Sequence, residues 1–125
     1  MDIKDCKILI CDDSILARKQ LKDVLTSAGC CNFLEARDGQ AAIDIYKAEK
    51  PTLVFLDIVM PNVDGIEAVK QIMAFDKDAV IIMVSSVGTQ NQIKASLLEG
   101  AKDFIQKPFV ATQITNVLKK RVEGI

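Results

Sequence analysis

The chain has 125 residues, of which 50% are hydrophobic and 26% are charged, and its formal net charge is −1. This length predicts one domain that can bury a core, and the balanced charge argues against nucleic-acid binding, which usually needs a basic surface. We expect a cytoplasmic protein, since no apolar run approaches the roughly 20 residues of a membrane span and the N-terminus lacks the pattern of a signal peptide.

Apolar strands alternate with amphipathic helices along the first half of the chain. Residues 7–11 (KILIC) form a continuous apolar run that predicts a strand, and helical spacing of apolar residues follows over 14–28. Gly29 is expected to end this helix. Residues 32–36 predict a second strand, and residues 38–50 predict a helix that ends before a proline.

The second half continues the alternation. Its expected elements are a strand at 53–57, a helix over 66–73, a strand at 79–85, a helix at 89–100, a strand at 103–106 and a helix over 110–121. Five strands alternating with five helices predict an α/β fold, with a parallel sheet covered by helices on both faces. Ligands of such sheets bind beyond the carboxyl ends of the strands.

Polar or charged residues stand at the carboxyl ends of four expected strands. They are Asp12 and Asp13 after the first strand, Asp57 at the end of the third, Ser85 at the end of the fourth and Lys107 after the fifth. Each has an ordinary alternative role, such as a helix cap at Asp13 or Ser14, a turn residue or a solvated lysine. One shared site explains all of them together. Residues 35–37, which end the second strand, receive no role.

Three carboxylates at one sheet edge repel one another unless a cation joins them. Mg²⁺ prefers oxygen ligands and leaves room for phosphate oxygens. A softer metal is not expected, because the chain has no His and its cysteines lack metal-ligand spacing. With Mg²⁺ and a lysine present, one carboxylate is left to attack phosphorus. The residues therefore predict phosphoryl transfer to an aspartate.

Four motifs carry a resemblance to a known family. They are CDDS at 11–14, LDIVMPNVDG at 56–65, MVSS at 83–86 and GAKDFIQKPF at 100–109. In this order and spacing they resemble response-regulator receiver domains, and among these the single-domain CheY-like chemotaxis regulators. The resemblance covers nearly the whole chain. It implies a doubly wound, flavodoxin-like sheet of order 2-1-3-4-5, and a single receiver domain over 1–125 without an attached effector domain.

The resemblance also implies a metal site around the phosphate acceptor. Asp57 is expected to be the acceptor. Asp13 is expected to bind Mg²⁺ directly, Asp12 to bind it mainly through water, and the backbone carbonyl of Val59 to complete the ligands. Gly65 is expected to permit the backbone conformation that starts the next helix.

Further residues are expected to read out the phosphate. Lys107, joined to Pro108 by an expected cis bond, contacts the phosphoryl oxygens, and Ser85 donates a hydrogen bond to them. Ser85 and Phe104 are the expected switch residues, with Phe104 entering space that opens when Ser85 moves. Val59 and Val87 lie two residues after Asp57 and Ser85, and we expect both to hinder the hydrolytic water.

The implied function is that of a phosphorylation-activated response regulator. A sensor histidine kinase is the expected phosphodonor, and output is expected through contact with a protein such as a flagellar motor switch protein. A phosphatase is a further candidate partner. The chain is expected to be a monomer. It is expected to catalyse only its own phosphorylation and dephosphorylation and not to be an enzyme otherwise. A phosphorelay carrier without a motor target is the alternative output.

Three other functions fit the same fold class. A flavodoxin-like nucleotide or flavin carrier would need a phosphate-binding loop where CDDS places two acids. A haloacid dehalogenase-type phosphatase would need a second aspartate at the position of Val59. A non-phosphorylated adaptor would not need the complete set of acids and lysine. The cysteines, Cys6, Cys11, Cys30 and Cys31, are expected to be free thiols, with nothing that supports a redox role for Cys30 and Cys31.

Overall fold

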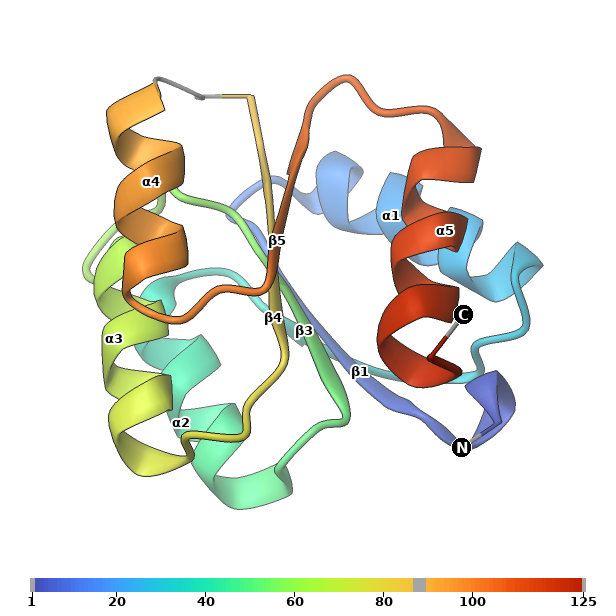
Figure 1. Ribbon diagram of the computed structural model, residues 1–125, viewed down its shortest axis with the longest axis horizontal. Coiled ribbons are helices and arrows are strands. Elements are labelled where there is room, and N and C mark those ends of the chain that lie inside the picture. The colour runs from blue at the N-terminus through green and yellow to red at the C-terminus, as the bar shows by residue number, and fades with distance from the viewer. Residues whose placement is uncertain (1, 87–89, 125) are drawn as a thin grey trace.

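The computed structural model, which describes residues 2–86 and 90–124, confirms the alternation of strands and helices (Figure 1). The strands are β1 (Lys7–Cys11), β2 (Asn32–Ala36), β3 (Leu53–Leu56), β4 (Ile81–Ser85) and β5 (Asp103–Gln106). The helices are the 3-10 turn η1 (Ile3–Asp5), α1 (Ile15–Ser27), α2 (Gly39–Glu49), α3 (Gly65–Phe75), α4 (Gln90–Leu98) and α5 (Ala111–Val122). Residue 89, the expected start of the fourth helix, lies outside the described residues, as does Val87.

Some element bounds differ from the prediction. β4 begins at Ile81 instead of residue 79, because the Ala79 amide donates to the Asp76 carbonyl at 3.1 Å and so belongs to a turn. β3 ends one residue before Asp57. The η1 turn was not predicted. Gly29 follows α1 with a φ of 111°, a conformation that favours glycine, and this confirms the expected helix end.

All five strands run parallel, in the order β2-β1-β3-β4-β5. This confirms the predicted strand order. Strand β1 has neighbours on both sides, with Cys11 in register with Ala36 of β2 and Leu56 of β3. The carboxyl ends of the strands therefore share one edge of the sheet, which is the upper edge in Figure 1.

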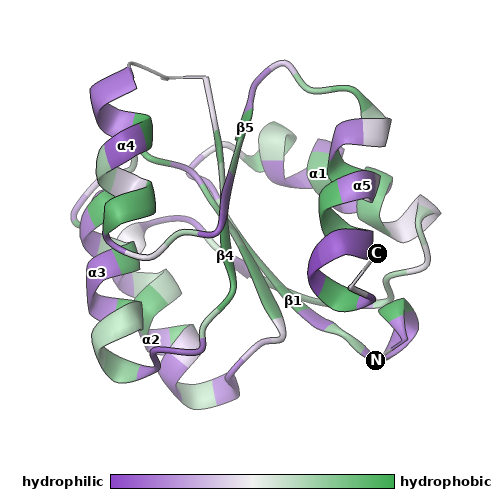
Figure 2. Cartoon of the chain, viewed as in Figure 1, coloured by the Kyte–Doolittle hydropathy of each residue, from purple (hydrophilic) through white to green (hydrophobic). Residues whose placement is uncertain are grey.

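Helices cover both faces of the sheet, with α1 and α5 on one face and α2, α3 and α4 on the other (Figure 1). Successive strand residues point to opposite faces, so Leu9 packs in the core beneath α2 and α3, whereas Ile8 and Ile10 pack beneath α1 and α5. Figure 2 shows the resulting hydrophobic strands between helices of mixed polarity. Each fully buried Leu or Ile stabilises the fold by about 1.5–3 kcal/mol.

Aspartate and serine side chains cap three helices. Ser14 Oγ accepts from the Ala17 amide at 3.2 Å, at the start of α1. Asp38 and Asp64 cap α2 and α3 in the same way. Ser14, not Asp13, therefore takes the cap that both could have supplied, and the Asp13 side chain stays exposed at the sheet edge. Among the described residues, no helix has the length and apolar character needed to cross a membrane.

The four cysteines are free thiols, and burial separates them into two classes. Cys6, Cys11 and Cys30 are buried, whereas Cys31 is exposed. Burial raises the pKa of the Cys30 thiol to about 11 and also raises the pKa values of Cys6 and Cys11. Because the thiolate is the reactive form, these buried groups should react slowly.

We expect iodoacetamide to modify one thiol of the folded protein at about pH 8, that of Cys31, and all four in denaturant. Mass spectrometry of the intact chain would count the labels. Cys31→Ser is the control and should take up no label while folded. Two or more labels on the folded parent would contradict the assigned burial.

Candidate functional site

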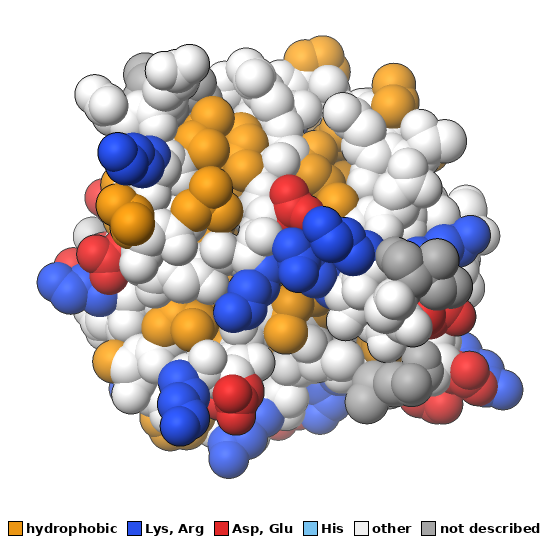
Figure 3. Space-filling view, in the orientation of Figure 1, with side chains coloured by type: hydrophobic (Ala, Val, Ile, Leu, Met, Phe, Trp, Pro, Cys, Tyr) orange, Lys and Arg blue, Asp and Glu red, His pale blue; other side chains and the backbone are white. Residues whose placement is uncertain are grey.

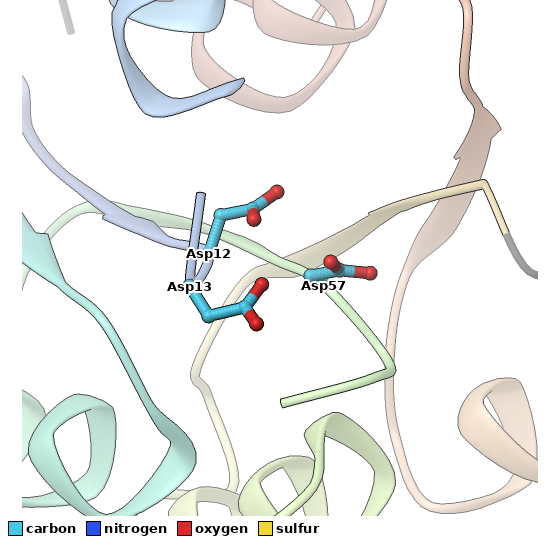
Figure 4. A group of neighbouring side chains, drawn as sticks. All are labelled: Asp12, Asp13 and Asp57. Atoms are coloured by element: carbon cyan, nitrogen blue, oxygen red, sulfur yellow. The ribbon is translucent and has the colours of Figure 1, made fainter. Parts of the chain in front are cut away.

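Three acidic residues meet at the carboxyl edge of the sheet. Asp12 and Asp13 directly follow β1, and Asp57 directly follows the neighbouring strand β3. One carboxylate oxygen of each residue lies within 4.8 Å of those of the other two. Asp12 is 6% exposed and Asp57 is 8% exposed, whereas Asp13 is open to solvent. Figure 4 shows the three carboxylates side by side beyond the ends of the two strands. The structure thus brings together the acids that the sequence predicted.

The backbone around Asp57 is held on both sides. The Asp57 amide donates to the Cys11 carbonyl at 3.0 Å, which extends the β1–β3 pairing by one bond past the end of β3. The Ile58 amide donates to Oδ1 of the Asp57 side chain at 2.7 Å. The second oxygen, Oδ2, faces the ammonium of Lys107 at 3.7 Å. The two oxygens of this carboxylate are therefore distinct, and Oδ2 is the one directed towards the cation.

Gly65 fixes the far end of the loop that follows Asp57. Its amide donates to the Ile58 carbonyl at 2.7 Å. A Cβ at this position would lie 2.0 Å from the Asp57 carbonyl oxygen. Gly65 starts α3, as expected, but its φ is not among the positive values found for glycines. The glycine is required because the helix start lies directly against the backbone of the acidic site.

Side chains of the same loop alternate between core and solvent. Ile58 and Met60 are buried, and the Met60 sulfur contacts the Cys11 thiol at 3.2 Å. Val59 lies between them and is 53% exposed. Val59 is thus on the loop beside the acids, as predicted, and the ligand role of its carbonyl stays a prediction.

Lys107, the residue after β5, supplies a positive charge. Its Nζ lies 2.5 Å from Asp12 Oδ2 and 3.7 Å from Asp57 Oδ2. The Lys107 amide donates to the Ser85 carbonyl at 2.9 Å, which holds this segment against the end of β4. The Lys107–Pro108 bond is cis, as predicted. One ammonium against three carboxylates leaves two negative charges, and a divalent cation would balance them.

The predicted switch residues lie on one face of the sheet. Ser85 is fully buried at the end of β4. Phe104 of β5 is paired with Met83, is partly buried and packs against the core beneath α2 and α3. Because side chains two residues apart share a face, Ser85 points to the same side as Met83 and therefore as Phe104. This placement is the one the proposed coupling needs; the switching roles themselves stay predictions.

Two residues near the acids had no predicted role. Arg18 of α1 donates from Nη1 to the Asp12 carbonyl at 2.5 Å and from Nε to Glu35 Oε1 at 3.1 Å. Glu35 belongs to β2, in register with Ile10 of β1. An acid near the carboxyl end of β2 was a visible signal. The role of Glu35 depends on Arg18 facing β2, and the helical pattern of α1 does not show which of its faces is turned towards β2.

The donor set suits a hard cation. Within residues 2–86 and 90–124, the three aspartates are the group of His, Cys, Asp or Glu side chains that could share a metal ion. All of their ligand atoms are carboxylate oxygens, which Mg²⁺ prefers. The acidic cluster is therefore compatible with Mg²⁺ binding.

The response regulator receiver domain model matches residues 8–119. The chain belongs to this family. The receiver domain is 42% identical to chemotaxis protein CheY of Thermotoga maritima, over 91% of this chain and 95% of that protein. It is also 42% identical to chemotaxis protein CheY of Bacillus subtilis, with the same coverage.

A solved structure shows the same fold. It is the crystal structure of a CheX–CheY–BeF₃–Mg²⁺ complex from Borrelia burgdorferi, with a TM-score of 0.88 and 38% identity. The match covers 92% of this chain and 87% of that chain. The receiver fold predicted from the sequence is thereby confirmed.

Proposed function

We propose that this receiver domain accepts a phosphoryl group on Asp57 from a phosphohistidine of a sensor histidine kinase, and then signals by protein contact as a CheY-like chemotaxis regulator. The observation that carries the proposal is the convergence of three aspartate carboxylates and the Lys107 ammonium at one sheet edge. The similarity to two proteins named chemotaxis protein CheY supports the chemotaxis assignment.

The environment of Asp57 suits attack on phosphorus. Its Oδ1 is held by the Ile58 amide, so Oδ2, on the side of Lys107, is the oxygen that we assign to the attack. The P–N bond of the phosphohistidine breaks as the P–O bond to Oδ2 forms, and the imidazole leaves with the electron pair. Asp12, Asp13, Asp57 and the Val59 carbonyl would hold Mg²⁺, which when bound supplies charge neutralisation for the phosphoryl oxygens.

Lys107 can change partners during this reaction. In the present structure its ammonium is closest to Asp12, at 2.5 Å. Phosphorylation adds roughly −1.5 to −2 charge units and three acceptor oxygens. The ammonium then has a stronger partner on Asp57 and releases the Asp12 carboxylate. In this way Lys107 holds the acids in place before transfer and stabilises the product afterwards.

The same new charge can bias the rest of the domain. The Ser85 hydroxyl is drawn towards the phosphoryl oxygens, and Phe104 occupies the space that opens on the same face of the sheet. This is a shift between two existing states, driven by a local charge. It would reshape the surface built from α4, β5 and α5. Figure 3 shows hydrophobic side chains on this surface, with Lys and Arg side chains gathered between β5 and α5, a mixture that suits a protein partner.

Partners follow from the same relatives. A histidine kinase supplies the phosphoryl group, and a flagellar motor switch protein is the proposed target of the phosphorylated form. The similarity to a CheY solved together with CheX supports a CheX-like partner, which we propose as the phosphatase. The chemistry of the chain itself is confined to its own phosphorylation and dephosphorylation.

Binding of beryllofluoride, a phosphoryl mimic, tests the proposal. We expect beryllofluoride with Mg²⁺ to shift the NMR signals of Asp57, Ser85, Phe104 and Lys107. Beryllofluoride alone should shift none of them, and Mg²⁺ alone should shift signals beside the acids but not those of Ser85 and Phe104. Signals that stay unchanged with both reagents would overturn the proposal. A flavin carrier or a non-phosphorylated adaptor would give that unchanged spectrum.

The exposed Val59 side chain leads to a separate prediction about the lifetime of the phosphorylated form. It stands beside Asp57 and has no group that could orient a water molecule. We expect Val59→Asn to speed the loss of phosphate roughly tenfold, which corresponds to about 1.4 kcal/mol of barrier. The decay of radiolabelled phosphoprotein would measure it. Val87, for which the same shielding effect is expected, lies outside the described residues.

Val110→Asn is the matched control, since Val110 is exposed at the same edge of the sheet and precedes α5, where asparagine is a good cap. Its phosphorylated form should decay at the parent rate. An unchanged or slower decay in Val59→Asn would count against a shielding role for this side chain.

A further inference from the structure

Asp12, which follows β1, is held from several directions. The Asp12 amide donates to the Ala36 carbonyl at 3.0 Å, and Asp12 Oδ1 accepts from the Ser14 amide at 2.9 Å. The Asp12 carbonyl accepts from Arg18 Nη1 at 2.5 Å. This carbonyl belongs to the peptide that joins Asp12 to Asp13. The hydrogen bond from Arg18 therefore fixes the plane of that peptide and the direction in which the Asp13 side chain leaves the backbone.

Arg18 is itself held in place. Its Nε donates to Glu35 Oε1 at 3.1 Å, and its side chain is only 14% exposed. Lys22 Nζ lies 3.7 Å from the other oxygen of this carboxylate, Glu35 Oε2. A planar guanidinium can bind a carbonyl and a carboxylate at once in a fixed geometry, which a lysine ammonium cannot. These contacts connect Glu35 of β2, through Arg18 of α1, to the peptide between Asp12 and Asp13.

We propose that Arg18, oriented by Glu35, is a positioning residue for the metal-binding acids. The inference rests on the proposed function, because it assumes that Asp12 and Asp13 serve a divalent cation. Arg18 acts through the Asp12–Asp13 peptide and not by contact with the reacting groups. Groups that orient metal ligands in this way commonly affect affinity for the metal about 10–100-fold.

Charge and geometry predict opposite effects for the loss of Arg18. The guanidinium is a positive charge beside a cation site, so its removal alone should make Mg²⁺ bind more tightly. Loss of the hydrogen bond frees the peptide plane, so that Asp13 must be ordered when the cation binds, and Mg²⁺ should bind more weakly. The sign of the change therefore separates the two roles.

Mg²⁺ titration of the full chain, followed by amide NMR signals, tests the inference. We expect Arg18→Ala to raise the Kd for Mg²⁺ about tenfold. Arg18→Lys should raise the Kd as well, though less, because lysine keeps the positive charge but lacks the planar set of donors that binds the carbonyl and the carboxylate at once. Glu35→Ala should raise it in the same direction, and the effects of Glu35→Ala and Arg18→Ala should not add in the double variant. In the absence of metal, the Asp13 amide signal should already shift in Arg18→Ala.

Arg121 offers a matched control. It also donates to a backbone carbonyl, that of Lys102 at 2.7 Å, and lies 3.5 Å from the Asp103 carboxylate. This contact is at the start of β5, the opposite edge of the sheet from the acids. Arg121→Ala should therefore cost stability but leave the Kd for Mg²⁺ unchanged. Thermal unfolding of both variants would show whether their losses of stability are comparable.

The outcomes distinguish a failure of the proposed function from a failure of the proposed role of Arg18. A parent chain that binds no Mg²⁺ would refute the proposed function. A parent that binds Mg²⁺, with Arg18→Ala binding it equally well or more tightly, would overturn the role of Arg18 alone. Should Arg18→Ala not fold, Arg18→Lys decides, since a Kd equal to that of the parent contradicts positioning by the guanidinium.

Discussion

Asp57→Asn is expected to abolish phosphorylation by acetyl phosphate and by a phosphorylated histidine kinase. The asparagine keeps the size of the side chain but removes the negative charge and the nucleophilic oxygen that faces Lys107. We expect no acyl-phosphate label on this variant, measured with radiolabelled donor and checked by the lability of the label to hydroxylamine.

Asp64→Asn is the matched control for this loss. Asp64 lies on the same loop, is exposed and caps α3 through the Glu67 amide at 2.9 Å. Asparagine caps helices about as well as aspartate, so this variant should be labelled at the parent rate. Labelling of Asp57→Asn at the parent rate, with the label on no substitute residue, would refute the assignment of the acceptor.

The structure gives a reason to propose Asp57, and not its two neighbours, as the acceptor. Asp12 is already engaged, because Oδ2 lies against Lys107 and Oδ1 accepts from the Ser14 amide. Asp13 is exposed, so water surrounds its carboxylate and weakens any fixed geometry. Asp57 is buried, its backbone extends the sheet, and one of its oxygens faces the lysine. Of the three, this carboxylate combines restricted motion with an oxygen that faces the ammonium at 3.7 Å, beyond hydrogen-bond distance.

Much of the fold could be predicted because helix and strand periods differ along the chain. The continuous apolar runs of β1, β3 and β4 predict strands that are covered on both faces, and the structure buries both faces. The start of β4 was harder to predict. Residues 79 and 80 are as apolar as the strand itself, and only the hydrogen bond from Ala79 to Asp76 places the first of them in a turn.

The acids and the lysine could be predicted because parallel topology brings strand ends together whatever the details of packing. Arg18 and Glu35 could not, since their contact depends on the register of β2 against β1 and on the rotation of α1. The choice between Asp13 and Ser14 as the helix cap was equally open, because either side chain can accept from an amide two or three residues later. Local residue types permit several such contacts, and tertiary packing selects among them.

Gly65→Ala is expected to destabilise the fold and distort the acceptor site together. The added Cβ would lie 2.0 Å from the Asp57 carbonyl oxygen and 2.7 Å from Ile58 Cα. Both contacts are with backbone, which cannot rotate away, so the start of α3 must move from the end of β3. We expect the free energy of unfolding to fall by about 3 kcal/mol, a large effect for overpacking. Urea denaturation followed by circular dichroism would measure it.

Gly124→Ala separates this clash from a general effect of replacing glycine. No atom lies within 4 Å of a Cβ at that position, although its φ of +75° disfavours alanine. Its cost should therefore be the backbone strain alone, about 1 kcal/mol. Under conditions where Gly65→Ala is still folded, the displaced Asp57 should also take up phosphate more slowly, whereas Gly124→Ala should match the parent. Parent-like stability and phosphorylation in Gly65→Ala would show that the loop can yield, and that the close contact between α3 and the site is not needed to hold Asp57.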